Sequence, residues 1–202
     1  EYKVGSCQFS DIAVFSFHPV KIITSGEGGM LCTNNKKLDQ KIKLLRSHGI
    51  TKDANEMLDK NSADLPWYYE QNCLGFNYRL TDIQAALGIS QLSRVQDFIH
   101  QRATIASIYQ KELADLPLQL QQQSDDIYSA WHLFVVRVKS SKSNAREHLY
   151  RHLKVNGIYC QIHYIPIPSQ PYYQSLGFDI ENFPNTKQYY QECISLPVYP
   201  DL

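Results

Sequence analysis

The chain has 202 residues, 43% of them hydrophobic, and its 20 basic side chains balance its 20 acidic ones. This size and composition suit a globular protein with a buried core, and the balanced charge gives no reason to expect a nucleic acid or an anionic membrane as partner. No apolar window has the length of a membrane-spanning helix, so we expect no membrane association and a cytoplasmic protein without a leader peptide.

The cysteine and histidine patterns give no sign of a metal. The five cysteines are scattered and form no Cys-x-x-Cys pair, which is typical of reduced cytosolic thiols and not of a disulfide framework or a zinc site. His148 and His152 have the spacing of metal ligands on one helix face, but we expect an exposed helix surface there and no metal site.

The first predicted elements are two short strands on either side of a polar bend. An apolar run ends at Ser16 and is followed by His18 and Lys21, then by a glycine-rich turn at 24–29 and a second apolar run at 30–32. A lysine is costly to fix in an interior unless its amine is paired, neutralised or used covalently. The neighbouring serine, histidine and glycines favour chemistry at Lys21 over an ordinary surface lysine in a hairpin.

Helical spacing predicts the next elements. Apolar residues recur at helical intervals over 36–47, behind an asparagine cap and before a glycine stop. Residues 51–65 show no clear period and are expected to form a surface excursion. Thr81 and Gln84 fit a capping box, and the apolar pattern that follows predicts one long helix running toward Leu113.

The remaining third of the chain alternates between strand and helix patterns. A glycine-free, glutamine-rich turn is expected at 119–124, a strand at 131–138, a helix at 143–156 and another strand at 158–164. The last residues, 194–200, have an extended pattern. This order indicates a small α+β domain after the long helix.

Four motifs together resemble the DegT/DnrJ/EryC1/StrS family of sugar aminotransferases. They are Phe15-Ser16-Phe17-His18-Pro19-Val20-Lys21, Gly26-Glu27-Gly28-Gly29, Arg46-Ser47-His48-Gly49 and Gly75-Phe76-Asn77-Tyr78-Arg79-Leu80-Thr81-Asp82 with the Ile83-Gln84-Ala85-Ala86-Leu87-Gly88 that follows. Three further segments are most similar to family members of pseudaminic acid biosynthesis: Pro66-Trp67-Tyr68-Tyr69, Gln170-Pro171-Tyr172-Tyr173 and Leu196-Pro197-Val198-Tyr199-Pro200.

The resemblance implies an α/β fold, the pyridoxal 5'-phosphate (PLP)-dependent transferase fold type I. Residues 1–80 would be the end of the large PLP-binding domain, 81–115 a long connecting helix and 116–202 most of the small C-terminal α+β domain. The aspartate that pairs with the cofactor's ring nitrogen in this family is not in the sequence. We therefore expect a fragment that lacks the N-terminal half and is a poor catalyst by itself.

The resemblance also implies roles for individual residues. Lys21 would bind the cofactor covalently, and the Ser16 hydroxyl would donate to its phosphate. Asn77 would reach the phosphate of the neighbouring subunit, so that a homodimer shares its active sites; the alternative is a turn residue before the helix. His163 and Tyr164 would contact the substrate.

Some of these roles stay open. His18 could contact the substrate or the cofactor, or be a structural histidine. Glu27 would order the lysine loop or be a solvated carboxylate. Pro168 stands where the family often has a histidine, so any substrate contact made by that histidine is missing or replaced.

The implied reaction transfers an amino group from glutamate to the C4 keto carbon of a UDP-linked 6-deoxy N-acetylhexosamine. Two alternatives remain. One is a different enzyme of the same fold, either an aminotransferase for another nucleotide 4-keto or 3-keto sugar or a dehydrase. The dehydrases of this family have histidine in place of the lysine, so Lys21 speaks against a dehydrase. The other is a catalytically silent fragment that acts as a binding or dimerisation module.

Overall fold

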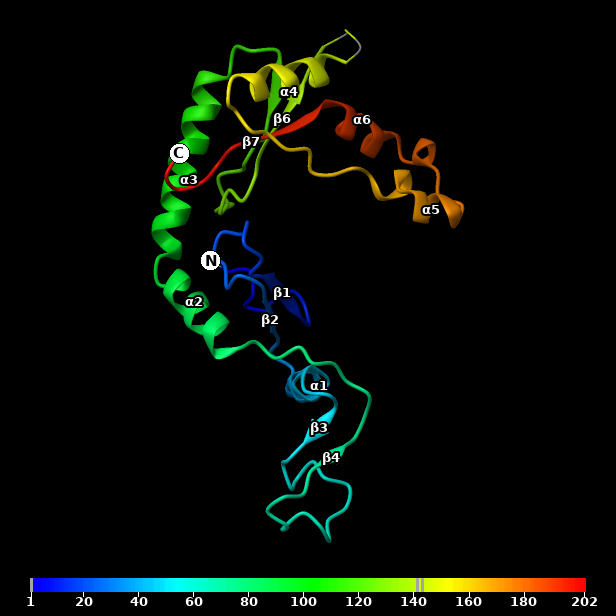
Figure 1. Cartoon of the computed structure of the whole chain (residues 1–202). Coiled ribbons are helices and arrows are strands. Elements are labelled where there is room, and N and C mark those ends of the chain that lie inside the picture. Colours follow the sequence, from blue (N-terminus) through cyan, green and yellow to red (C-terminus); the bar gives the residue numbers. More distant parts are fainter. Residues whose placement is uncertain (1, 141, 143) are drawn as a thin grey trace. The chain divides into compact units, whose positions relative to one another are not determined.

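The computed structural model describes residues 2–140, 142 and 144–202, which fold as two compact units, Glu1–Ser93 and Arg94–Leu202 (Figure 1). The boundary between them falls inside the segment 81–115, for which the sequence predicts one connecting helix. No helix among the described residues is long and apolar enough to cross a membrane.

The first unit begins with the two predicted strands. β1 (Ala13–Ser16) pairs antiparallel with β2 (Gly29–Cys32), with Ser16 opposite Gly29. The connection between them is the polar bend that carries Lys21. The strand prediction is therefore confirmed, and the pairing brings the serine at the end of one strand beside the glycines that open the other.

A helix and a small two-stranded sheet follow. α1 (Lys36–Arg46) begins at Asn35, whose side chain accepts from the first backbone N–H groups of the helix, as the sequence predicts. β3 (Ile50–Thr51) pairs antiparallel with β4 (Glu70–Gln71). These strands close the base of the polar excursion between them.

The C-terminal end of α1 is capped by a segment distant in sequence. The N–H groups of Phe76 and Tyr78 donate to the carbonyl oxygens of Leu45 and Arg46 at 2.7 and 2.9 Å, and His48 N donates to Phe76 O at 2.8 Å. The last carbonyls of a helix lack partners within it, so these bonds satisfy groups that would otherwise be orphaned. Two of the sequence motifs thus form one structural unit.

The single long helix predicted from Thr81 is wrong: α2 (Asp82–Leu92) and α3 (Val95–Glu112) are separate helices. The capping box of Thr81 and Gln84 is confirmed. Ser93 Oγ donates to Ser90 O at 2.8 Å and so occupies the carbonyl that a continuous helix would offer to the N–H of Arg94. This local bond accounts for the break.

The second unit is built on an antiparallel sheet in the order β5 (Leu118–Leu120), β6 (Phe134–Val138), β7 (Cys193–Leu196). The predicted strand at 131–138 and the extended C-terminal pattern are confirmed. The predicted turn at 119–124 is wrong in part, because its first residues belong to β5. The predicted strand at 158–164 reduces to one antiparallel pair, Gln161 with Ser195.

The segment between β6 and β7 contains one long helix and several short ones. α4 (Ala145–Val155) agrees with the predicted helix at 143–156, although residue 143 lies outside the described residues. The sequence prediction missed the short helices that follow: η1 (Ile167–Ser169), α5 (Pro171–Ser175), η2 (Ile180–Asn182) and α6 (Pro184–Glu192). α5 and α6 each begin with proline, a first-turn signal that the sequence did offer.

The core of the second unit lies between the sheet and α3. Its buried residues are Ala106, Trp131, Phe134, Val136, Cys160, Ile194 and Val198. Arg102 of α3 is 6% exposed, and its Nη1 donates to Val198 O at 2.7 Å and to Trp131 O at 3.2 Å. Tyr109 of α3 donates to Pro197 O at 3.0 Å. These bonds fix the C-terminal segment to the helix.

Candidate functional site

The bend that carries Lys21 is closed at its base by the backbone of Phe17. Phe17 N donates to Gly28 O at 2.9 Å, and Phe17 O accepts from Ser25 N at 3.1 Å and from Thr24 Oγ1 at 2.9 Å. Inside the bend, Lys21 N donates to His18 O at 3.0 Å. The lysine is therefore held on a closed loop between two paired strands and not on a free surface turn.

Ser16 and His18 lie on the approach to this bend. The hydroxyl of Ser16 accepts from the backbone N–H of His18 at 3.4 Å, which leaves its own proton available to a ligand. His18 Nδ1 accepts from Val20 N at 3.4 Å, and its Nε2 lies 3.9 Å from Glu27 Oε1. The Glu27 side chain is 72% exposed, so its role in ordering the lysine loop stays a prediction beside the alternative of a solvated carboxylate.

The donor set of the bend fits PLP, the cofactor that the family resemblance implies. Lys21 is half-buried, and among the described residues its Nζ has no hydrogen-bond or ion-pair partner. An unpartnered primary amine suits covalent attachment to an aldehyde, and a strand-end hydroxyl suits a phosphate oxygen. Lys21 and Ser16 together supply both groups.

Ser25 is a residue that the sequence reasoning did not single out. It is 1% exposed, and its hydroxyl donates to Glu27 O at 2.8 Å. Gly28, the residue directly after that carbonyl, has a φ of +151°. A small hydroxyl residue directly before a glycine-rich turn was the signal available in the sequence.

Asn77 lies on the segment that caps α1. It forms an isolated antiparallel pair with Ser47, and its side chain is exposed. No hydrogen bond among the described residues joins Asn77 to Ser16 or Lys21. The predicted contact of Asn77 with a neighbouring subunit's cofactor stays a prediction.

His163 and Tyr164 belong to the second unit. His163 Nδ1 lies 2.8 Å from the hydroxyl of the buried Ser195 on β7, and the His163 and Tyr164 rings meet edge to face with centroids 4.6 Å apart. Tyr164 is 69% exposed. One side chain is thus fixed to the sheet while the other projects from it, and their predicted contact with substrate stays a prediction.

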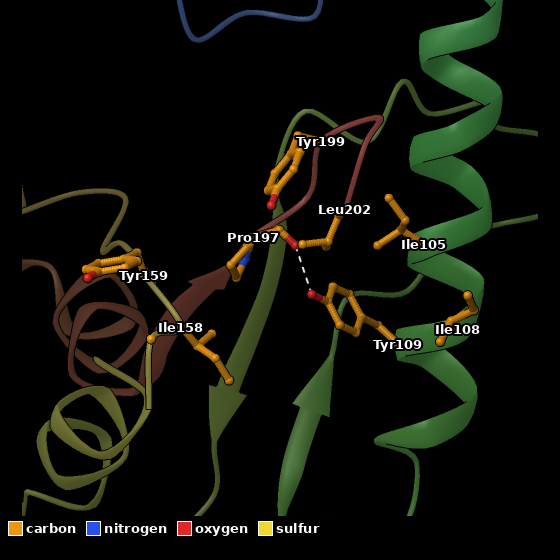
Figure 2. A pocket seen from close by; sticks show the side chains of 9 residues that line it. Ile105, Ile108, Tyr109, Ile158, Tyr159, Pro197, Tyr199 and Leu202 are labelled. Atoms are coloured by element: carbon orange, nitrogen blue, oxygen red, sulfur yellow. Dashed lines mark hydrogen bonds between the residues drawn. The ribbon is translucent and has the colours of Figure 1, made fainter. Parts of the chain in front are cut away.

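The second unit also has an apolar groove of about 520 Å³ beside α3 (Figure 2). Its lining comprises Ile105, Ile108, Tyr109, Gly157, Ile158, Tyr159, Pro197, Tyr199 and Leu202. Burial raises the pKa of the Tyr109 phenol, whose proton is committed to Pro197 O. The groove offers apolar contact area and no acid, base or nucleophile near neutral pH.

A comparison with protein families decides the identity of the chain. The model of the DegT/DnrJ/EryC1/StrS aminotransferase family matches residues 2–202. The chain belongs to this family. The resemblance carried by the four sequence motifs is therefore confirmed, and the match extends over the lysine bend, the α1 cap and the second unit.

Relatives of the family agree with this assignment. The chain is 38% identical to the spore coat polysaccharide biosynthesis protein SpsC of Bacillus subtilis over 203 residues, which are 98% of this chain and 51% of SpsC. The chain thus spans about half the length of the curated relatives it matches.

Solved structures confirm the α/β fold class of the fold-type I aminotransferases. The chain matches the PMP form of the putative sugar aminotransferase Spr1654 of Streptococcus pneumoniae with a TM-score of 0.87 and 28% identity, over 98% of this chain and 48% of Spr1654. It matches PseC of Helicobacter pylori, an aminotransferase of pseudaminic acid biosynthesis, with a TM-score of 0.82 and 32% identity, over 96% of this chain and 49% of PseC.

Proposed function

We propose that the protein containing this chain is a PLP-dependent sugar aminotransferase and that Lys21 is its cofactor-binding and proton-transferring residue. The observation that carries the proposal is the unpartnered half-buried amine on a bend whose base is closed by Phe17. Membership of an aminotransferase family supports it, as do the PLP and PMP forms reported for Spr1654.

The roles of this chain's residues follow from their chemistry. When bound, the cofactor supplies a ring that withdraws electrons from the carbon bearing the amino group. Lys21 Nζ would hold the cofactor covalently at rest. Once the amino donor has taken its place, the freed Nζ takes the proton from the donor's α-carbon, and in the second half of the reaction it delivers a proton at the keto carbon of the sugar.

Ser16 and His18 are the other proposed site residues near Lys21. The Ser16 hydroxyl donates to the phosphate, because its only bond among the described residues is the one it accepts from His18 N. His18 accepts from Val20 N on one ring nitrogen and faces Glu27 with the other, and the proposal gives it a contact with the substrate. The proposal keeps His163 and Tyr164 as substrate-binding residues.

We further propose glutamate as the amino donor and a UDP-linked 4-keto-6-deoxy N-acetylhexosamine as the acceptor, as in pseudaminic acid biosynthesis. The likeness to PseC supports this acceptor. The second candidate for the acceptor is another nucleotide 4-keto or 3-keto sugar, because the chain is also similar to other sugar aminotransferases. A panel of such sugars, assayed with glutamate for the aminated product, separates the two.

A homodimer with shared active sites, in the cytoplasm, completes the proposal. The exposed Asn77, which is not bonded to Ser16 or Lys21 of its own chain, supports a contact with a second subunit. Strongly exposed apolar side chains of the first unit, such as Val14 at 72% and Ile83 at 85%, support a larger assembled body. The scattered cysteines support a reducing compartment.

One experiment tests the lysine and the shared site together. In the protein expressed from its complete reading frame, Lys21→Ala should abolish amino transfer, and Asn77→Ala should weaken it strongly. Mixed dimers of the two variants contain one intact site, so refolding an equimolar mixture should recover about a quarter of the wild-type activity. Full activity of Lys21→Ala would refute the role of Lys21, and a mixture no more active than its components would refute the shared site.

A further inference from the structure

The side chain of Ser25 lies at the point where the lysine bend meets α2. Among the described residues of the first unit, it is one of the few that are buried, at 1% exposure. A buried hydroxyl is costly unless it has a partner, and that of Ser25 donates to Glu27 O at 2.8 Å. The bond therefore fixes the carbonyl of Glu27, one residue before Gly28.

Gly28 leaves room for the Ser25 side chain, and Gly88 lies next to it. A Cβ built on Gly28 would lie 2.5 Å from Ser25 Oγ and 2.8 Å from Leu80 Cδ1, which is too close for real atoms. A Cβ on Gly88, in the middle of α2, would lie 3.7 Å from Ser25 Cβ, in ordinary van der Waals contact. Ser25 thus packs between the glycine-rich turn, the lead-in to α2 and α2 itself.

The backbone of Ser25 is equally engaged. Its N–H donates to Phe17 O, the same carbonyl that accepts from Thr24 Oγ1, and Phe17 N donates to Gly28 O. Any shift of Ser25 would therefore be passed to both ends of the bend. Because these bonds join the two ends of the bend, the position of Ser25 sets the direction in which the bend leaves the strands.

We propose that Ser25 is the positioning residue of the lysine bend: its buried hydroxyl and its seat against Gly88 of α2 set the orientation in which Lys21 Nζ is presented to the cofactor. This inference rests on the proposed function. Ser25 is not a catalytic residue, because its hydroxyl is committed to Glu27 O and is shielded from solvent. It acts through the bend alone.

Two substitutions of nearly equal volume separate the effect of the Ser25 hydroxyl from the effect of side-chain size. Ser25→Thr and Ser25→Val both add atoms to a tight seat, so any overpacking is common to both. Only threonine keeps a hydroxyl that can donate to Glu27 O. The matched control is Ser107→Ala, since Ser107 Oγ also donates to a carbonyl, Ala103 O, at 3.0 Å, but in an exposed position outside the bend.

The first measurement is amide hydrogen exchange in the cofactor-free protein expressed from its complete reading frame. The amides of residues 17–28 should exchange about tenfold faster in Ser25→Val than in Ser25→Thr, because one buried hydrogen bond is lost. Ser107→Ala should leave these amides unchanged. Equal exchange in the valine and threonine variants would overturn the proposal.

The second measurement reports the orientation of Lys21 and not merely the stability of the fold. Each variant is incubated with PLP and reduced with borohydride, and the share of the trapped label on Lys21, relative to all other lysines, is read by peptide mass mapping. This share should fall several-fold in Ser25→Val and remain high in Ser25→Thr and Ser107→Ala. An unchanged share in Ser25→Val would reduce Ser25 to a structural residue and overturn the inference.

The wild-type protein separates this failure from that of the proposed function. If wild-type Lys21 is labelled and the variants do not differ, only the positioning role is refuted. If Lys21 is not labelled even in the wild type, the proposed function falls, and the inference that rests on it falls with it.

Discussion

Glu192, at the end of α6, joins three side chains in the second unit. Its carboxylate accepts from Arg137 Nη2 at 2.7 Å and from Lys139 Nζ and Gln188 Nε2 at 2.9 Å each. The Glu192 side chain is 19% exposed. Because Arg137 lies on β6 and Glu192 ends the helix before β7, these bonds tie α6 to the sheet.

Replacing Glu192 with glutamine tests this tie. The variant keeps the shape of the side chain but loses the charge that Arg137 and Lys139 share. Hydrogen bonds to a charged group are worth about 1.5–3 kcal/mol each when buried, and partial exposure reduces this, so we expect a loss of about 1–2 kcal/mol. In a unit of this size the melting temperature should fall by roughly 5–10 °C.

The pH dependence of stability gives the prediction a sign. Burial alone would raise the pKa of Glu192, but the hydrogen bonds from Lys139, Gln188 and Arg137 outweigh it and hold this pKa below its ordinary value of 4.5. The stabilisation is therefore present above the unfolded-state pKa, at neutral pH, and is lost as the pH falls through the lower folded-state pKa. Part of the acid-induced loss of stability should vanish in Glu192→Gln.

The assay is thermal unfolding followed by circular dichroism from pH 7 down to pH 3. Glu147→Gln is the matched control, because Glu147 pairs with Arg151 on an exposed helix face and should leave the melting temperature almost unchanged at pH 7. If Glu192→Gln melts at the wild-type temperature throughout, or if the control variant loses as much stability, the reasoning is refuted.

Two further substitutions test packing in the two units. Gly49→Ala should destabilise the protein by about 3 kcal/mol or more, because the new Cβ would lie 1.8 Å from Cys73 O at a φ of +70°. Gly157 has a similar φ of +79° but lies in open space, so Gly157→Ala should cost only about 1 kcal/mol. Equal losses of melting temperature in the two variants would contradict the packing argument. Arg102→Met should lower the free energy of unfolding by about 2–3 kcal/mol, as measured with denaturant, because two buried carbonyls lose their donor. The loss is limited because the variant no longer buries the guanidinium, whose pKa is lowered by that burial. A variant as stable as the wild type would show that those carbonyls find other partners.

Local patterns of the sequence predicted the lysine bend well. The two strands, the cap at Asn35 and the capping box at Thr81 each depend on residues within a few positions of one another. Ser16, His18 and Lys21 are neighbours in the chain, so their grouping needed only the bend between the strands. Family resemblance then supplied the chemistry that a lone lysine would not have revealed.

Long-range contacts account for what the sequence did not reveal. Nothing in residues 44–49 indicates that Phe76 and Tyr78 cap the helix that ends there. The burial of Ser25 depends on a glycine in α2, far along the chain.

Short elements were missed for related reasons. The Leu118–Leu120 strand has only three residues, too few for an alternating pattern to stand out from the glutamines that follow. The break at Ser93 needed knowledge of one side-chain bond.

The covalent position of the cofactor is the most direct test of the account. The protein expressed from its complete reading frame would be incubated with PLP, reduced with borohydride and digested, and the peptides would be mapped by mass spectrometry. The account predicts a single dominant pyridoxyl group on Lys21, absent from Lys21→Ala. A label distributed over surface lysines such as Lys43 and Lys139, with Lys21 unmodified, would contradict it.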